Sequence, residues 1–132
     1  VTFNEKQLVV SLGERAGECV FGGVRFQWRF NGGNNDARRP RCEFFDAEQV
    51  GAQVVLRHWR AGDRFQPIGM RSAVKLQDWF TNQKITRTRR HQLIVATGAT
   101  GEIFWIEDQR IGEHFKLTPQ TKRRLIWRWK RL

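Results

Sequence analysis

The sequence is poor in residues that cross-link a chain or anchor it in a membrane. It has two cysteines, Cys19 and Cys42, which lie 23 residues apart and form no CxxC pair. A single disulfide fits this count, but free buried thiols in a reducing compartment fit it better. There is no signal peptide and no run of 18 apolar residues. We therefore expect neither secretion nor a membrane span, and a cytoplasmic location.

Catalytic motifs are also scarce. The three histidines lie 33 and 23 residues apart and give no zinc-ligand spacing, alone or with the cysteines. No GxSxG sequence, Walker loop or other glycine-rich nucleotide loop occurs. We expect Asp63 to bond its own backbone in a turn, and Glu107-Asp108 to lie on an exposed turn, not in a metal site. The chain is predicted to hold no catalytic residue, cofactor or metal.

Positive charge is abundant and confined to one half. Up to Leu56 there are 7 Lys or Arg and 7 Asp or Glu, whereas residues 57–132 hold 17 against 6 and so carry the whole net charge of +11. Solubility requires neither so large a charge nor its one-sided placement. The excess favours a polyanionic partner, most simply nucleic acid. Basic and aromatic residues alternate in this half, as on surfaces that bind phosphates and stack bases.

The hydrophobic pattern predicts an α+β fold in one domain, residues 1–132. Residues 8–12 and 24–30 alternate apolar and polar side chains, as strands with one buried face do, and Gly22-Gly23 is a hairpin turn or a bulge. Further strands are expected at 43–45, 53–59, 93–96, 102–106 and 125–130. Residues 75–83 fit a helix that buries Leu76, Trp79 and Phe80. We expect a mostly β sandwich or barrel-like sheet with one or two short helices.

Residues 31–41, NGGNNDARRPR, contain almost nothing to bury. We predict a flexible, solvated connecting loop, with RNA contact as the weaker alternative.

Ordered motifs in the second half resemble a known family. Residues 56–70, LRHWRAGDRFQPIGM, look like the GDRF-x-P-x-G-M signature in the C-terminal domain of tRNA(Ile)-lysidine synthetase. KLQDWF at 75–80 resembles its KLK-[DE]-F-F helix. Lys84-Ile85 with Arg90, and GEIFWI at 101–106 with Arg110-Ile111, resemble later motifs. The resemblance spans about residues 43–125, and the sequence departs from it at Thr86, Gln92 and Gln109.

The resemblance implies a fragment of a bacterial, cytoplasmic tRNA-modifying ligase. The full enzyme uses ATP to adenylate the wobble cytidine of tRNA(Ile) and displaces AMP with lysine. Its Ser-Gly-Gly-x-Asp-Ser loop is absent here, so the chain is expected to have no catalytic site of its own. The implied role is to hold tRNA(Ile) by its acceptor stem. The implied fold is shared with a domain of bacterial phenylalanyl-tRNA synthetase β chains.

We predict RNA contacts from ten basic residues: Arg57, Arg60, Arg64, Arg71, Lys75, Lys84, Arg87, Arg89, Arg90 and Arg110. The alternative is a non-catalytic protein-interaction or dimerisation module with aromatic strands at its interface, and homodimerisation stays open. A third interpretation, a small hydrolase that uses Asp63 and His58, fits the sequence least well.

Overall fold

The computed structural model describes residues 2–13, 15–31 and 39–132. Its strands are β1 (Gln7–Ser11), β2 (Gly17–Phe21), β3 (Val24–Phe30), β4 (Cys42–Asp46), β5 (Gln53–Arg57), β6 (Arg64–Phe65), β7 (Val74–Lys75), β8 (Val95–Thr97), β9 (Ile103–Ile106) and β10 (Arg124–Arg131). Its helices are α1 (Ala47–Val50), α2 (Leu76–Asn82), α3 (Arg87–Gln92) and the 3-10 turn η1 (Glu113–Phe115).

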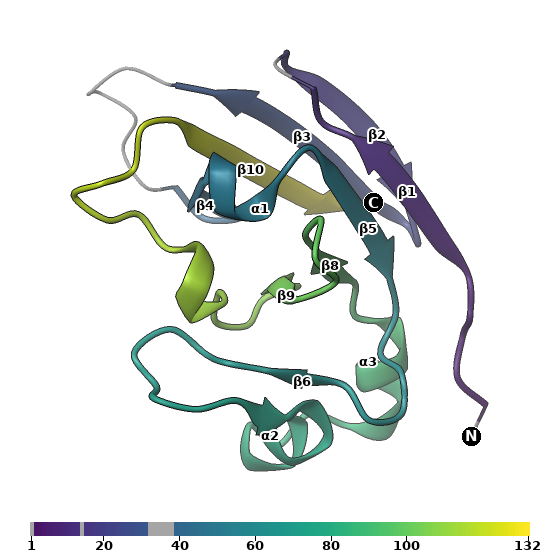
Figure 1. Cartoon of the computed structure of the whole chain (residues 1–132). Helices are drawn as coiled ribbons and strands as arrows, with labels where there is room; N and C mark the ends of the chain where they lie inside the picture. The colour runs from purple at the N-terminus through teal and green to yellow at the C-terminus, as the bar shows by residue number, and fades with distance from the viewer. Residues whose placement is uncertain (1, 14, 32–38) are drawn as a thin grey trace.

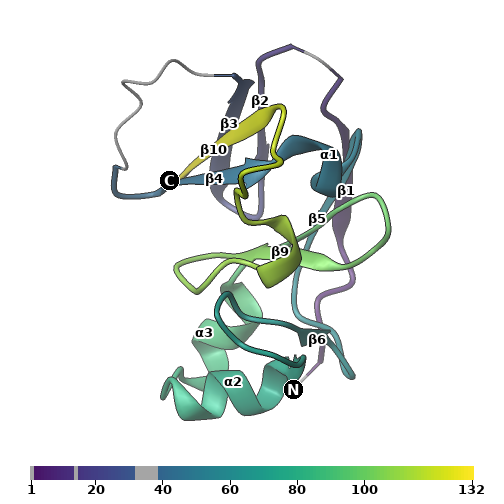
Figure 2. The ribbon, with the colours of Figure 1, turned by 60° about the vertical axis from the view of Figure 1, so that its left-hand side comes forward.

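The strands form two four-stranded antiparallel sheets and one small hairpin. One sheet has the order β1-β5-β8-β9, the other β2-β3-β10-β4, and β6 pairs with β7. In Figures 1 and 2 the β1-β5-β8-β9 sheet lies between the other sheet and a lower layer built from β6, β7, α2 and α3. We call this lower layer the cap. The molecule therefore has three layers, and the middle sheet is covered on both faces.

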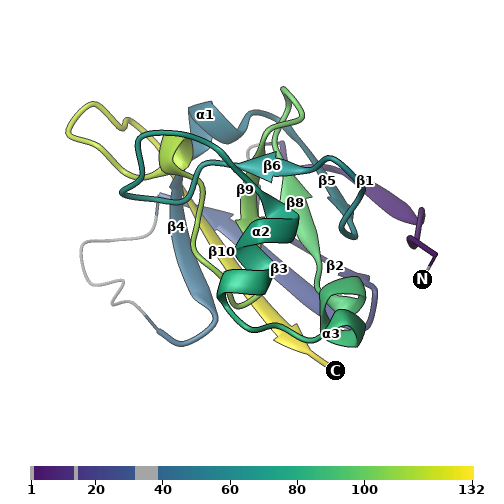
Figure 3. The same cartoon turned by 90° about the horizontal axis from the view of Figure 1, so that it is seen from below.

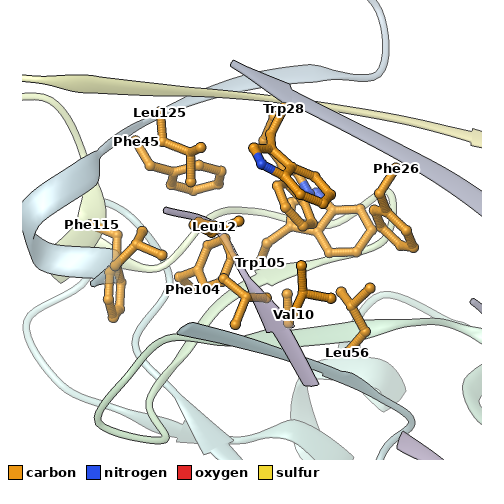
Figure 4. Close-up of a cluster of buried hydrophobic side chains, with 14 of the residues drawn as sticks. Val10, Leu12, Phe26, Trp28, Phe45, Leu56, Phe104, Trp105, Phe115 and Leu125 are labelled. Carbon is orange, nitrogen blue, oxygen red and sulfur yellow. The ribbon is translucent and has the colours of Figure 1, made fainter. Parts of the chain in front are cut away.

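The main core fills the space between the two sheets. Strand β3 points Val24, Phe26 and Trp28 inward and its arginines outward, as its alternation predicts. Tryptophans from both sheets meet there, with the ring centres of Trp105 and Trp127 6.0 Å apart. Figure 4 shows the aromatic side chains of Phe26, Trp28 and Trp105 in one cluster with the aliphatic side chains of Val10, Leu12 and Leu56. Burial of this many large side chains supplies the main stabilisation of the fold.

A second core joins the cap to the middle sheet. Helix α2 buries Leu76, Trp79 and Phe80 against Val95 and Ile106 of the sheet. Figure 3, seen from the cap side, shows α2 and β6 in front of β8 and β9. Trp79 and Phe80 are thus core residues, as the helical spacing predicts.

Most of the predicted elements are confirmed, with three corrections. The sheets are stacked and do not close, so the barrel-like alternative is wrong. The described residues contain three α-helices, because Arg87–Gln92 forms α3, which the sequence pattern did not suggest. Between the strands expected at 43–45 and 53–59 the chain forms the one-turn helix α1, and the Glu48 and Gln49 amides of this helix donate to the Asp46 carboxylate.

The predicted loop 31–41 lies mostly outside the described residues, since 32–38 are not among them. Both of its described ends are tied to β10. The Asn31 amide donates to the Arg124 carbonyl (3.0 Å), and the Trp129 amide donates to the Arg41 carbonyl (3.2 Å).

The cysteines fit the expectation of free thiols. Cys42 is buried, Cys19 is half-buried, and neither is in a disulfide. Burial raises the pKa of both thiols, which keeps them protonated and unreactive near neutral pH.

Candidate nucleic-acid interface

The cap presents a cationic surface built on the β6–β7 hairpin. Arg64 in β6 lies directly opposite Lys75 in β7, and both side chains are exposed. Like charges in directly opposed positions destabilise a strand pair, so this pairing is unfavourable without an anion nearby. The hairpin runs straight into α2, which begins at the next residue.

Helix α2 ends where the backbone turns into the left-handed region at Lys84 (φ 58°). The Ile85 amide donates back to the Phe80 carbonyl at 3.0 Å and the Gln83 amide to the Trp79 carbonyl at 2.9 Å. These bonds complete the last turn and leave the Gln83 and Lys84 side chains exposed at the helix end.

Trp79 separates two open grooves on this surface. The first, about 500 Å³, is lined by Arg64, Lys75, Asp78, Asn82, Gln83 and apolar residues of the hairpin. The second, about 350 Å³, is lined by Glu43, Ile68, Asp108, Gln109, Arg110 and Ile111. Trp79 and Gln83 border both grooves. The structure thus brings Arg64, Lys75 and Arg110 to one surface, although they are far apart in sequence.

The indole of Trp79 is held in place from both sides. Its Nε1–H donates to Oε1 of Gln109 (3.2 Å), and its ring meets Phe65 edge-on at 5.3 Å. The Arg110 guanidinium lies 6.0 Å from the Trp79 ring centre, near the limit of a cation–π contact. Arg110 is therefore positioned by the ring while its N–H donors stay available.

Five of the predicted residues have exposed cations without a side-chain partner. Within the described part of the chain, no hydrogen bond or ion pair is formed by the side chains of Arg64, Arg71, Lys75, Lys84 and Arg87. An unpaired surface cation is free to bind a phosphate without first breaking an internal contact.

Four of the predicted residues are engaged within the fold. Arg57 is buried and forms a two-point pair with Asp63, so its guanidinium is not available to a partner. Arg60 donates to the side-chain oxygen of Gln7, the first residue of β1. Arg89 pairs with Asp108 at 3.1 Å, with both side chains largely exposed. Arg90 donates through Nε to the Ile85 carbonyl at 2.7 Å.

Asp63 behaves as the sequence predicts. Its carboxylate accepts a hydrogen bond from the Arg60 amide at 2.8 Å across the turn. The prediction for Glu107 is wrong. Glu107 is 1% exposed and accepts two bonds from Arg131, at 2.6 and 2.8 Å, whereas its neighbour Asp108 is exposed. No group of three or more metal-ligating side chains is found among the described residues.

Two of the three residues that depart from the family pattern, Thr86 and Gln109, use their side chains in a hydrogen bond, whereas Gln92 contributes its backbone carbonyl. The Thr86 hydroxyl accepts from the Arg89 amide and caps α3, and the Gln92 carbonyl accepts from Arg131. The side-chain oxygen of Gln109 accepts a hydrogen bond from the indole N–H of Trp79. A role for Gln109 in fixing Trp79 was not visible in the sequence, because 30 residues separate the two.

Residues 54–127, more than half of the chain, match the family described as the TilS substrate C-terminal domain. The chain belongs to this family. It is 40% identical over 82 residues to a protein named tRNA(Ile)-lysidine synthase from Clostridium acetobutylicum, a match that covers 61% of this chain and 17% of that protein. It is 31% identical over 97 residues to a protein of the same name from Bacteroides thetaiotaomicron, a match that covers 70% of this chain and 22% of that protein. The chain thus spans about a fifth of the length of these relatives.

The fold agrees with this family. A crystal structure of a TilS C-terminal domain superposes with a TM-score of 0.75 at 19% identity and covers 96% of this chain and 98% of that one. An N-terminal fragment of the phenylalanyl-tRNA synthetase β-subunit from Pyrococcus horikoshii superposes with a TM-score of 0.56 at 14% identity, over 69% of this chain and 28% of that one. The expected likeness to that synthetase chain is confirmed at the level of the fold. In the described part of the TilS domain, every helix is too short or too polar to cross a bilayer.

Proposed function

We propose that this TilS domain binds tRNA through the cap and holds it for a catalytic domain outside these 132 residues. The observation that carries the proposal is the set of exposed cations on and beside the cap, of which Arg64, Lys75 and Arg110 line the two grooves beside Trp79. The surface comprises Arg64, Arg71, Lys75, Lys84, Arg87 and Arg110. The relatives of this domain are named for a reaction on tRNA(Ile), which supports tRNA(Ile) as the partner. The acceptor stem as the segment bound is part of the proposal. ATP-dependent lysine transfer is assigned to the catalytic domain.

The alternative, a protein-interaction or dimerisation module, finds less support in the structure. Large exposed hydrophobic side chains among the described residues are Val9, Val20 and Leu132, which belong to different strands or to the chain end. Stable protein interfaces have an apolar centre, whereas nucleic-acid interfaces are polar and strongly positive.

The test is tRNA affinity measured against salt concentration. If four to six phosphates are neutralised, log K falls against log salt with a slope of about −3 to −5. Arg64→Gln/Lys75→Gln removes two cations of the cap and flattens the slope by between about 1 and 2. Lys6→Gln/Lys122→Gln is the matched control, because it lowers the net charge equally at exposed residues outside the cap surface.

Three results would decide against this assignment. A wild-type domain that does not bind tRNA at low salt contradicts the tRNA-binding function. A salt-independent affinity contradicts a phosphate-based mode. A folded Arg64→Gln/Lys75→Gln variant that binds like the control double moves the site away from the cap.

A further inference from the structure

A second cationic surface lies on the outer face of the β2-β3-β10-β4 sheet. Because β3 points its apolar residues into the core, Arg25, Gln27 and Arg29 face outward. The register of β3 and β10 places Arg25 directly opposite Lys130 and Gln27 directly opposite Arg128. These side chains are exposed, so four cations project from two adjacent strands.

Two adjoining depressions mark this face. One, about 180 Å³, is lined by Arg25, Gln27, Pro40, Arg41, Arg128, Trp129 and Lys130. The other, about 460 Å³, has Arg29 and Arg128 on its lining together with Glu18 and Gln27. Gln27 and Arg128 border both. We call Arg25, Arg41, Arg128 and Lys130, with Gln27 between them, the sheet surface.

Among the described residues, no acid pairs with the cations of the sheet surface. Within the described residues, the side chains of Arg25, Arg128 and Lys130 form no hydrogen bond or ion pair. In the described part of the chain, Glu18 is the one carboxylate that lines either depression, and it accepts a hydrogen bond from Gln27 at 3.4 Å. An arginine and a lysine in directly opposed positions repel each other and weaken the strand pair.

Protection of a sheet edge does not explain these charges. Lysine and arginine are common on edge strands, where they prevent pairing with another chain. In this sheet β2 and β4 are the edges, and β3 and β10 are the two central strands. The spacing suits a phosphate backbone instead, since neighbouring cations on one strand face are separated by about 7 Å and those opposite each other by about 5 Å.

The sheet surface and the cap lie on opposite sides of the molecule. In Figures 1 and 2 the β1-β5-β8-β9 sheet lies between the β2-β3-β10-β4 sheet and the cap. The two hydrophobic cores fill the spaces between these layers. A single short duplex lying against α2 therefore does not reach Arg128 or Lys130. Any anion bound at the sheet surface is a different segment of RNA from the one bound at the cap.

We propose that the sheet surface binds the phosphate backbone of a second stretch of the same tRNA, an inference that rests on the tRNA-binding function proposed above. Arg25, Arg41, Arg128 and Lys130 supply the cations, and Gln27 supplies a neutral donor between them. The domain then contacts RNA on two opposite faces. The exposed side chains of this face are mainly charged or polar, with Val20 opposite Arg25 as an exposed apolar one, and this composition favours RNA over an acidic protein.

The test compares three double variants that lower the net charge equally. Arg128→Gln/Lys130→Gln changes the sheet surface, Arg64→Gln/Lys75→Gln changes the cap, and Lys6→Gln/Lys122→Gln is the control. We expect the sheet variant to flatten the salt slope of tRNA binding by between about 1 and 2 more than the control does. The charge-preserving exchange Arg128→Lys/Lys130→Arg should retain the wild-type slope, and near-ultraviolet circular dichroism verifies that each variant is folded.

A photo-crosslinking residue at position 27 identifies the bound partner. Crosslinks to tRNA that disappear in the Arg128→Gln/Lys130→Gln background support the proposal. If the wild type binds tRNA but the sheet variant behaves like the control, the second site is wrong while the cap assignment stands. The proposal is also overturned if, in the full-length enzyme, the residue at position 27 crosslinks to a protein and not to tRNA. If the wild-type domain itself does not bind tRNA, the result contradicts the proposed function and not the second site alone.

Discussion

The guanidinium of Arg57 and the carboxylate of Asp63 form a buried two-point pair that closes the turn between β5 and β6. Nη1 donates to Oδ2 at 2.9 Å and Nη2 to Oδ1 at 3.0 Å, and both side chains are nearly inaccessible. Nη1 also donates to the His58 carbonyl. The pair fixes the path by which the chain leaves the middle sheet and enters the cap hairpin, so it positions Arg64.

Removing one partner of this pair should be strongly destabilising. Asp63→Asn leaves a buried guanidinium without its counter-charge, and we expect a loss of about 3–5 kcal/mol in the free energy of unfolding. Urea denaturation measures it. Asp108→Asn is the control, because the Arg89–Asp108 pair is largely exposed and should contribute less than about 1 kcal/mol. Equal losses in the two variants would show that the Arg57 pair does not hold the turn.

Substitution of two arginines of α3 should have different effects, one on tRNA binding and the other on the stability of the fold. Arg87 is exposed without a side-chain partner among the described residues, so Arg87→Ala should flatten the salt slope of tRNA binding by about 1 and leave the melting temperature unchanged. Arg90 donates to the Ile85 carbonyl, so Arg90→Ala should destabilise the domain by about 1–2 kcal/mol. If Arg87→Ala lowers the stability and Arg90→Ala does not, α3 packs differently from the arrangement described here.

Stability should fall on mild acidification because of His58. The residue is 5% exposed, and burial lowers the pKa of its imidazole below the ordinary value of 6.5. The unfolded chain gains a proton on His58 as the pH falls through 6.5, whereas the folded chain resists protonation. His58 therefore contributes stability above pH 6.5 that is lost as the pH falls toward its folded pKa.

The measurement is the free energy of unfolding of wild type and His58→Asn between pH 7.5 and about pH 5, the range over which an ordinary histidine becomes charged. The variant should show a smaller decline than the wild type. Parallel curves would mean that the decline has another source, such as a carboxylate.

The C-terminal strand should depend on the pair between Arg131 and Glu107. Arg131→Ala leaves the buried Glu107 carboxylate with the Ile94 amide as a donor, at 3.2 Å. Because the Arg131 side chain is 35% exposed, we expect a loss of about 2 kcal/mol, less than for a fully buried pair. Chemical denaturation tests this. Lys130→Ala, at an exposed neighbouring position, should change stability little, and a similar loss there would indicate general fraying of β10.

The sequence by itself determined the local structure and the family. The alternation at residues 24–30 specified the inward face of β3, and the spacing of Leu76, Trp79 and Phe80 specified the buried face of α2. Both patterns were readable because strand and helix have fixed periods that a few consecutive residues reveal. The ordered motifs from Leu56 onward indicated the TilS family, and the one-sided charge favoured the nucleic-acid partner that we propose. The helix at Arg87–Gln92 was not predicted, because it has no buried residue and therefore no helical spacing of apolar side chains.

Tertiary structure decided which charged residues are available to a partner. Arg57 and Arg64 stand in the same basic motif, yet the first is buried against Asp63 and the second is exposed in a groove. Glu107 and Asp108 are adjacent, yet one is buried against Arg131 and the other lies at the surface. Arg25 meets Lys130 although 105 residues separate them, because β3 and β10 pair as neighbouring strands. Such pairings arise from strand order and register, which depend on the packing of the whole chain and leave no local period in the sequence.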